Sequence, residues 1–529
     1  MNTIKKNWPF VLILLVYVLY AGIYIYKTSF VADGERYFVL FDDAMISMRY
    51  AKNLAEGYGL VWNPGEPPVE GYTNPLWVVF MAIFHLLPIP IAKMSLTIQI
   101  SGAIFLTANL VYVKKIAASL SNNIIVPVLA MILTAFYMPL NNWGLQGMEV
   151  SILTLITSIA LWMSIQCLRN NCFSPWIYFL LGVGTLIRID MAVPYLVIFG
   201  YLFIADSKNR KNNFLWGLGL LAVFILSQTL FRFWYYGDVL PNTYYLKMEG
   251  FPLLLRIKRG LYVFSKFAIQ MNWVLFLLPF SLLVFRRNRV VMLLALIVLG
   301  QIAYSIYVGG DAWEHQGGGN RYISIGIPIF FILFTYSIDQ IFRAIASHTN
   351  ASGTLKPLLI NLGIALFVLA SMYNFNFTLR TARRTIETWI LKRQPIFVEG
   401  NKEALNIAIA LKQITTPEAR LAVVTAGAIP YFSTRPAIDL LGKNDPVIAH
   451  RPSHIPTALA DIRPGHMKWD YDYSIGQLKP DVVVQLWGDS QPAEKYIEDY
   501  YTIVEVNGML FSILSDSENI LWDRVQIQP

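Results

Sequence analysis

Two adjacent carboxylates, Asp42 and Asp43, are the residues best suited to chemistry in this sequence of 529 residues. They open a segment, residues 41–77, that follows the first long apolar run and contains acids, an arginine, glycines, prolines and aromatic rings. Ionisable groups at a membrane boundary indicate a functional site by default. A carboxylate there could take the proton of a hydroxyl group that attacks a phosphate-linked sugar. Because phosphate departs as an anion, one base and a cationic phosphate clamp would suffice.

Asp42 has a second interpretation as the N-cap of a helix predicted over residues 44–56, because Asp is favoured at that position. Arg49 lies seven residues after Asp42, two helical turns along and therefore on the same face. It could bind a donor phosphate or form a structural ion pair with the acid. The sequence leaves both questions open.

The composition predicts an integral membrane protein. Hydrophobic residues make up 56% of the chain and charged residues 14%, whereas soluble domains carry about 25% charge. The net charge of +9 is then explained by basic cytoplasmic loops and anionic lipid rather than by a nucleic-acid partner. The only cysteines, Cys167 and Cys172, lie in or beside one short loop, so no disulfide framework is predicted.

The apolar stretches predict about eleven membrane-spanning helices, each built from roughly 20 mostly apolar residues. The first has basic residues before it but no small-residue cleavage site, so we expect an uncleaved helix. The stretches cover residues 9–26, 95–113, 124–140, 150–166, 174–187, 191–204, 214–236, 261–285, 290–308, 322–341 and 358–373.

Basic residues predict the orientation of these spans. An amino terminus in the cytoplasm places most loop lysines and arginines on the cytoplasmic side, as the positive-inside rule requires. Fusing the fifth and sixth spans would bury Arg188 and Asp190 in the membrane and reverse every later loop, so we keep them separate. The cytoplasmic set is then Lys5, Lys6, Lys114, Lys115, Arg169, Lys208, Arg210, Lys211, Arg286, Arg287, Arg289 and Arg343.

Several cations fall on the opposite, outer face. Arginine matches phosphate geometry with two parallel hydrogen bonds, so cations on that face indicate an anionic ligand. Contact with lipid headgroups is the alternative. The candidate residues for a donor phosphate are Arg49, Arg188, Lys247, Arg256 and Arg321.

Two further outer segments carry polar groups among glycines and aromatic rings. The glycine-rich segment 309–322 contains Asp311, Glu314 and His315, for which sugar contacts or a mobile lid are favoured over a metal site. The segment 234–247 contributes Asp238 and Asn242. No metal site is predicted, and a requirement for a divalent metal is left open. His450, His454 and His466 are expected to be surface or structural residues.

The chain is expected to divide into a membrane part, residues 1–375, whose first outer loop covers residues 27–94, and a soluble domain, residues 376–529. The soluble part alternates an amphipathic helix at 403–414 with the runs LAVVTA, DVVVQL, YTIVEV and MLFSIL. Helices alternating with short buried strands predict a small α/β domain. The expected fold class is therefore mostly α, a polytopic helical bundle with a carboxyl-terminal α/β domain.

The first outer loop resembles a known pattern. It reads D-D-x-x-I-S-x-R-Y-A, then G-x-G-L-V-x-N-P-G-E and V-E-G-Y-T-N-x-L-W, from Asp42 to Trp77. Further matches lie in order at 147–149, 236–238, 241–243 with Lys247, 309–311 with Arg321, and 438–440 through 445–446. This pattern is similar to that of bacterial membrane glycosyltransferases of the GT-C superfamily related to the mycobacterial terminal arabinofuranosyltransferase. Departures occur in the long glycine-rich stretch before Arg321 and at Ile189, where proline is usual, so an arabinose donor is not carried over.

The resemblance implies a GT-C fold and a polyprenyl-phosphate-linked sugar donor. It also implies transfer to a glycan acceptor on the periplasmic face of the bacterial inner (cytoplasmic) membrane, with a first-loop aspartate as base and Asp42 favoured. No cofactor is required in this interpretation. The rival functions are a lipid-linked sugar transporter or flippase and a non-catalytic glycan-binding scaffold. The expected substrate-binding residues are Glu70, Tyr72, Asn74, Glu149, Asp238, Asn242, Asp311 and His315.

Overall fold

All eleven predicted apolar stretches form helices in the computed structural model, which describes residues 2–285, 288–314, 320–347, 356–376 and 382–527. Within these ranges seven helices are long and apolar enough to cross a membrane. They are α1 (Asn2–Thr28), α4 (Ile91–Leu120), α7 (Val150–Asn170), α10 (Arg210–Tyr236), α15 (Arg289–Tyr307), α17 (Ile327–Ser347) and α18 (Lys356–Asn376).

Two more candidate spans are bent. Helices α5 (Ile125–Ala135) and α6 (Met138–Leu145) meet at 54°. Helix α12 (Leu253–Gln270) meets the segment Trp273–Phe285 at 104°. That segment consists of α13 (Trp273–Leu277), η2 (Leu278–Ser281) and α14 (Leu282–Phe285).

The fifth and sixth predicted spans remain separate but short, as α8 (Trp176–Ile187) and α9 (Ala192–Ala205). A single turn of 3₁₀ helix, η1 (Ile189–Met191), lies between them, and Tyr178 of α8 packs against Tyr195 of α9. Arg188 pairs with Asp190 in this turn. The described part of the chain therefore has up to nine candidate spans plus this short pair, a multi-pass membrane protein.

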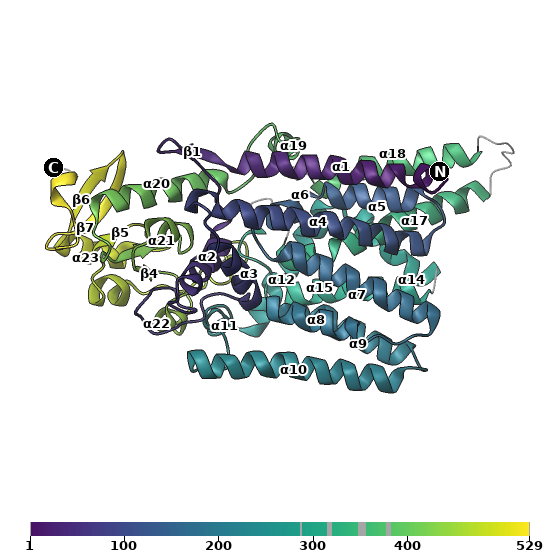
Figure 1. The fold of residues 1–529 in the computed structure, drawn as a ribbon, viewed down its shortest axis with the longest axis horizontal. Coiled ribbons are helices and arrows are strands. Elements are labelled where there is room, and N and C mark those ends of the chain that lie inside the picture. The colour runs from purple at the N-terminus through teal and green to yellow at the C-terminus, as the bar shows by residue number, and fades with distance from the viewer. Residues whose placement is uncertain (1, 286–287, 315–319, 348–355, 377–381, 528–529) are drawn as a thin grey trace.

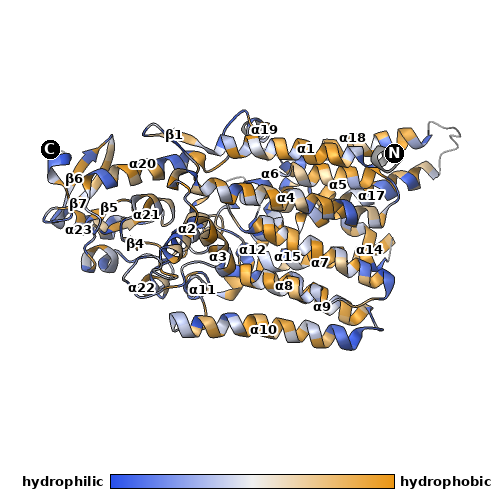
Figure 2. Cartoon of the chain, in the orientation of Figure 1, coloured by the Kyte–Doolittle hydropathy of each residue, from blue (hydrophilic) through white to orange (hydrophobic). Residues whose placement is uncertain are grey.

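The bundle and the carboxyl-terminal domain lie end to end in Figure 1, with the amino terminus at the far end of the bundle. Figure 2 shows apolar residues along the bundle helices and hydrophilic residues at their ends. Helix α10 lies at the edge of the bundle, and most of it is exposed on the outer surface of the chain, as expected for a helix that contacts lipid.

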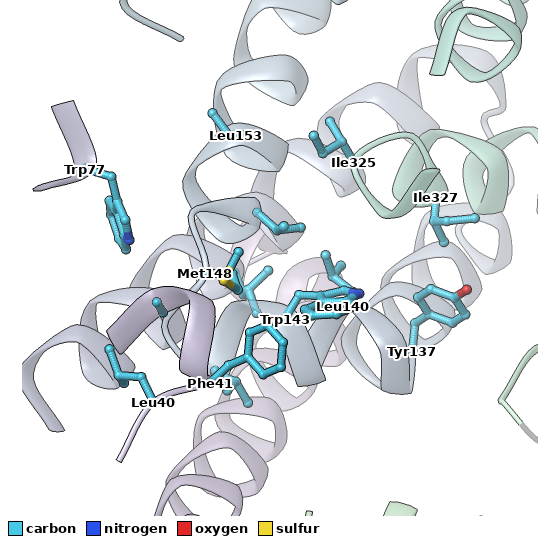
Figure 3. Packing of buried hydrophobic residues seen from close by; sticks show 14 of the residues in the cluster. Leu40, Phe41, Trp77, Tyr137, Leu140, Trp143, Met148, Leu153, Ile325 and Ile327 are labelled. Atoms are coloured by element: carbon cyan, nitrogen blue, oxygen red, sulfur yellow. The ribbon is translucent and has the colours of Figure 1, made fainter. Parts of the chain in front are cut away.

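The first outer loop folds into an antiparallel hairpin, β1 (Phe30–Ala32) with β2 (Glu35–Tyr37), and two helices, α2 (Asp42–Ala55) and α3 (Pro75–His85). Phe41 is the N-cap of α2, and no side chain caps the helix. Asp42 is therefore not the N-cap, and both acids lie in the first turn. Phe41 packs edge-on against Trp143 of α6, with ring centres 5.5 Å apart, which fixes the start of α2 against the buried core (Figure 3).

The carboxyl-terminal part has a six-stranded sheet in the order β4-β3-β5-β7-β6-β8, which confirms the expected α/β domain. The first three strands are parallel and the hairpin β6–β7 continues the sheet antiparallel. The strands are β3 (Leu421–Val423), β4 (Ala437–Asp439), β5 (Val482–Val483), β6 (Tyr501–Val506), β7 (Met509–Leu514) and β8 (Gln526–Ile527). The helices are α19 (Ala382–Trp389), α20 (Val398–Ile414), α21 (Ala428–Ser433), α22 (Pro446–Ala449), η4 (Asp472–Gln477), α23 (Gln491–Tyr500) and η5 (Trp522–Arg524).

Candidate active site

The first turn of α2 faces the carboxyl-terminal domain. Asp42 Oδ1 accepts hydrogen bonds from the backbone N–H groups of Gly427 and Ala428, at 3.1 and 2.8 Å. Burial raises the pKa of Asp42 to about 6, against the opposing effect of the nearby Lys443 ammonium group. This carboxylate is thus tied to the backbone of a segment almost 400 residues away.

Asp43 is held between two cations. Its Oδ1 lies 3.0 Å from Lys443 Nζ and its Oδ2 lies 3.3 Å from Arg321 Nη1. Burial alone would raise the pKa of Asp43, but Lys443 and Arg321 outweigh burial and hold this pKa well below its usual range. Asp43 therefore remains ionised at every physiological pH.

A cavity of about 120 Å³ is lined by Arg188, Lys247 and Arg321. Neither acid of the pair is among its lining residues, but Arg321 joins the cavity to Asp43. It is built from the η1 turn, from α11 (Asn242–Met248), from the end of α15 and from α16 (Arg321–Ser324). Pro464 of the carboxyl-terminal domain closes one part, so the cavity lies at the end of the bundle that faces this domain. Other lining residues include Thr73, Asp190, Thr243, Tyr304, Asp311 and Tyr322.

The two arginines of the cavity are already paired. Arg188 contacts Glu149 and Asp190, and Arg321 Nε lies 2.9 Å from Asp311 in addition to its contact with Asp43. Paired arginines keep their orientation and retain other donor groups for a ligand. They place fixed guanidinium donors on two sides of the cavity, while the carboxylates that pair with them offset their charge.

Lys247 is different, because it forms no hydrogen bond or ion pair with any residue that the structure describes. Burial and the neighbouring Arg321 and Arg188 lower its pKa to about 8. The hydroxyl group of Thr243, one helical turn earlier on α11, is also buried and has no hydrogen-bond partner within the described ranges. An unpaired ammonium group and an unpaired hydroxyl group in one cavity suit an anionic, oxygen-rich ligand such as a phosphate.

The other two predicted phosphate ligands lie elsewhere. Arg49 donates to the carbonyl oxygens of Trp62 and Arg435 and to Asn63 Oδ1, so its guanidinium group joins the first loop to the carboxyl-terminal domain. Arg256 donates to the carbonyl oxygen of Tyr307. Neither residue lines the cavity.

Two predicted substrate-binding residues of the first loop instead contact α10. Glu70 pairs with Arg232 at 2.7 Å, and both side chains are buried. The hydroxyl group of Tyr72 lies 2.6 Å from that of Tyr236. These contacts anchor the loop to the bundle.

Two others form a buried chain that reaches the cavity. Ser47 of α2 donates to Asn74 Oδ1, and Asn74 Nδ2 donates to Glu149 Oε2 at 3.1 Å. Glu149 in turn accepts from Arg188. The chain couples the position of α2 to that of a cavity arginine.

The four remaining predicted residues have four different outcomes. Asp238 stabilises its own turn, because its carboxylate accepts hydrogen bonds from the backbone N–H group of Val239 and from the Tyr245 hydroxyl group. Asn242 donates to the carbonyl oxygens of Gly442 and Lys443. Asp311 lines the cavity, whereas His315 lies outside the described residues. The described ranges contain no group of three or more His, Cys, Asp or Glu residues placed to hold a metal ion.

Sequence reasoning missed Lys443 and did not place His466 near the acid pair. Lys443 lies inside the stretch 438–446 that matched the resemblance pattern, which was the available signal. His466, expected at the surface or in a structural role, is buried near Asp43, and its ring is perpendicular to that of Trp313 at 5.4 Å. Burial, Lys443 and Lys247 lower the pKa of His466 to about 3, so its imidazole is neutral.

Comparison with known proteins adds information on the fold. The profile of a domain of unknown function (DUF8728) matches residues 394–519. No curated protein matches the chain in sequence. Among solved structures, the chain is similar to ArnT from Cupriavidus metallidurans in the apo state, with a TM-score of 0.53 and 11% identity over 96% of this chain and 98% of that one.

The chain is also similar to ArnT bound to undecaprenyl phosphate, with a TM-score of 0.50 and 10% identity over 82% of this chain and 86% of that one. The oligosaccharyltransferase of Archaeoglobus fulgidus, in complex with Zn and sulfate, has a TM-score of 0.56 and 12% identity over 97% of this chain and 74% of that one. The likeness to the mycobacterial arabinofuranosyltransferase rests on sequence motifs alone. The chain has the GT-C fold, the architecture that ArnT and the oligosaccharyltransferase share.

Proposed function

We propose that this protein is an inverting membrane glycosyltransferase that moves a sugar from a polyprenyl-phosphate donor to a cell-envelope glycan. One observation carries the proposal: a cavity lined by three cations is joined through Arg321 to a partly buried carboxylate, Asp43. Transfer from a phosphate-linked sugar needs these two elements, an anion site for the leaving group and a base for the acceptor.

The donor phosphate would lie in the cavity against Lys247 and Thr243, with Arg188 and Arg321 on either side. The ammonium group of Lys247 is the charge that no described residue neutralises. The similar fold of ArnT has been solved with undecaprenyl phosphate bound, so this architecture can hold such a lipid. The apolar tail of the donor would extend along the lipid-facing side of the bundle.

The reaction forms one bond and breaks one. The acceptor oxygen attacks the anomeric carbon, and the bond from that carbon to the phosphate oxygen breaks. The electron pair leaves with polyprenyl phosphate, which the cavity cations stabilise, and the acceptor proton passes to a carboxylate. One displacement inverts the anomeric configuration.

We assign the base to Asp43, although the resemblance favours Asp42. Asp43 contacts Arg321 of the cavity wall, whereas Asp42 accepts from the backbone of the carboxyl-terminal domain. Both oxygens of Asp43 retain lone pairs beyond those used by Arg321 and Lys443, so the ionised carboxylate can accept a hydrogen bond from the acceptor hydroxyl group. It would take the proton late, after attack on the anomeric carbon has made this hydroxyl group strongly acidic. Asp42 would then position the first turn of α2.

We also propose that the amino-terminal end of the bundle is cytoplasmic and that the site faces the periplasm. Several basic residues gather at that end, where Lys114 Nζ donates to Asn7 Oδ1 at 3.0 Å and Arg169 donates to the carbonyl oxygen of Ser119. A surplus of lysine and arginine marks the cytoplasmic side of bacterial membrane proteins. Labelling of single cysteines introduced at Lys208 and Lys412 by an impermeant reagent on intact cells tests this orientation, since only the second should react.

The cavity position favours an enzyme over a transporter. Transporters bind substrate near the middle of the membrane, where both sides can reach it, but this cavity is partly closed by Pro464 of the carboxyl-terminal domain. A glycan-binding scaffold would need no anion site beside an acid pair.

The decisive experiment uses the full chain in lipid nanodiscs with a panel of undecaprenyl-phosphate-linked hexoses and pentoses and a cell-envelope glycan extract. Mass spectrometry would record release of undecaprenyl phosphate together with a mass gain of one sugar on the extract. Release and gain in equal amounts support transfer. Donor movement between leaflets of proteoliposomes without either change would identify a transporter instead.

A further inference from the structure

One loop of the carboxyl-terminal domain, residues 439–445 between β4 and α22, supplies the domain's ion pair with Asp43. Asp439 shapes this loop, because its carboxylate accepts hydrogen bonds from the N–H groups of Leu441 and Asn444 at 3.0 and 2.8 Å and from the Asn444 side chain. Gly442 has φ of +74°, which favours glycine. These internal hydrogen bonds hold the loop in one conformation.

The membrane part forms hydrogen bonds with the same loop on two sides. On one side Asn242 of α11 donates to the carbonyl oxygens of Gly442 and Lys443, at 2.9 and 3.0 Å. On the other, the Tyr50 hydroxyl group donates to Asn444 Oδ1 at 3.0 Å. Gly71 lies so close that a Cβ atom there would be 1.9 Å from the same oxygen. The loop is therefore fixed relative to both the first loop and the cavity helix α11.

This loop inserts Lys443 next to the acids. Its side chain is 10% exposed, and its ammonium group lies 3.0 Å from Asp43 Oδ1. Burial would lower its pKa, but Asp43, Asp42 and Asp439 together raise it, so Lys443 is charged. A buried cation held by a fixed loop is a strong constraint on the carboxylate that it contacts.

We propose that Lys443 is a positioning residue of the transfer reaction, through which the carboxyl-terminal domain fixes the Asp43 carboxylate and stabilises its negative charge. This inference rests on the proposed function and assigns a role to the part of the chain that matches a domain of unknown function. The domain is then part of the active site rather than only an acceptor platform. Without it Asp43 would keep its ion pair with Arg321, which is shared with Asp311, and the more distant charge of Lys247.

Several charged and titratable groups around Asp43 influence the pH at which its carboxylate takes up a proton. Lys443 comes from the loop, Arg321 from α16, Lys247 from α11, and His466, which is neutral, from the carboxyl-terminal domain. Asp42 is the neighbouring acid on α2. Burial and the neighbouring Asp42 raise the pKa of Asp43, whereas the cations lower it. Removal of Lys443 takes away one of these cations, so Asp43 should take up its proton at a higher pH.

The test compares full-length wild-type protein with Lys443→Gln, Lys443→Arg and Lys412→Gln in nanodiscs. Lys412 is an exposed lysine of the same domain, so its variant is the matched control for loss of one charge. With the undecaprenyl-phosphate sugar that the wild type turns over, Lys443→Gln should lower kcat/KM at pH 7 on the order of 10- to 100-fold, as expected for a displaced catalytic group. Lys443→Arg should restore most of this loss.

The pH profile separates positioning from mere structural support. Lys443→Gln should introduce an acid limb in kcat/KM at least about one pH unit above any limb of the wild type, equivalent to a tenfold change in the ionisation constant. Lys412→Gln and Lys443→Arg should keep the wild-type profile. Loss of activity only in proportion to folded protein, with the wild-type profile retained, would overturn the inference.

A second measurement needs no turnover. Infrared titration of each variant, with the matching Asp43→Asn spectrum subtracted, reports the pH at which the Asp43 carboxyl group protonates. An unchanged protonation midpoint of Asp43 in Lys443→Gln contradicts the inference, even if the wild type transfers sugar. A raised midpoint in a protein that shows no sugar transfer contradicts only the proposed reaction. If Lys443→Gln does not fold, Asn242→Ala loosens the same loop and should shift the midpoint in the same direction.

Discussion

The guanidinium group of Arg321 lies 3.3 Å from the carboxylate of Asp43, although the two residues are 278 positions apart in the chain. Because Arg321 also lines the cavity, this contact joins the anion site to the acid pair. A phosphate that draws on Arg321 would therefore bring its sugar close to Asp43. The contact also explains why two acids with adjacent numbers behave differently.

Asp43→Asn should reduce sugar transfer by at least about 100-fold, the usual contribution of a general base. Asp42→Asn should reduce sugar transfer much less, because the amide oxygen of asparagine can still accept hydrogen bonds from the N–H groups of Gly427 and Ala428. Steady-state transfer assays in nanodiscs measure both variants. Binding of undecaprenyl phosphate serves as the control and should be retained in each, and a fully active Asp43→Asn would exclude Asp43 as the base.

Lys247→Gln should weaken binding of undecaprenyl phosphate about 10- to 100-fold, as expected for one charge-assisted hydrogen bond of about 1.5–3 kcal/mol. The reason is that Lys247 is the cavity cation without a partner among the described residues. Lys258→Gln, at an exposed lysine of α12, is the matched control and should bind normally. Equal affinity in the two variants would place the phosphate elsewhere.

The same lysine predicts a basic limb in donor binding. The pKa of Lys247 is lowered to about 8, so its positive charge is present below that pH and lost above it. Affinity for undecaprenyl phosphate should therefore fall as the pH rises from about 7 to 9, and Lys247→Gln should remove this fall. Titration calorimetry or a fluorescent lipid-phosphate competition assay would record the trend, and a limb that persists in the variant belongs to another group.

The parts of the site that sequence reasoning reached are those encoded locally. Asp42 and Asp43 stand at the start of a helix after an apolar run, and Arg188 marks the break between two short spans. Lys247 and Arg321 were found because they depart from the positive-inside trend. Each of these signals lies within a few residues of the group that it identifies.

What escaped prediction depends on long-range packing. Lys443 reaches Asp43 across 400 positions because the turn after β4 docks against Asn242 and Tyr50, and no local pattern specifies this docking. Glu70 and Tyr72 looked like ligand contacts in an outer loop, yet each meets a partner on α10 about 160 residues away. The polarity of a loop residue alone does not distinguish a substrate from a distant helix as its partner.

Glu70→Ala tests this distinction. Removal of one member of a buried ion pair leaves Arg232 unpaired and should destabilise the protein by about 3–5 kcal/mol. Glu66→Ala, which removes an acid of the same loop from an exposed pair with Arg420, should cost less than about 1 kcal/mol. Thermal unfolding in detergent compares the two, and turnover per folded molecule should stay within about twofold of wild type in both, since neither acid is among the residues that line the cavity.

The pH dependence of transfer separates the two acids without any substitution. The pKa of Asp42 is raised to about 6, so a reaction that uses Asp42 as base would lose rate tenfold per unit below about pH 6. The pKa of Asp43 is held well below its usual range, so a reaction that uses Asp43 should show no loss from this group as the pH falls from about 7 to 5. We expect the second result for kcat/KM in the wild type.

If a limb near pH 6 does occur, Asp42→Asn decides its origin. A limb that survives this change comes from another ionisable group, such as Glu314, whose pKa burial raises to about 7. A limb that disappears together with the activity would transfer the role of base to Asp42.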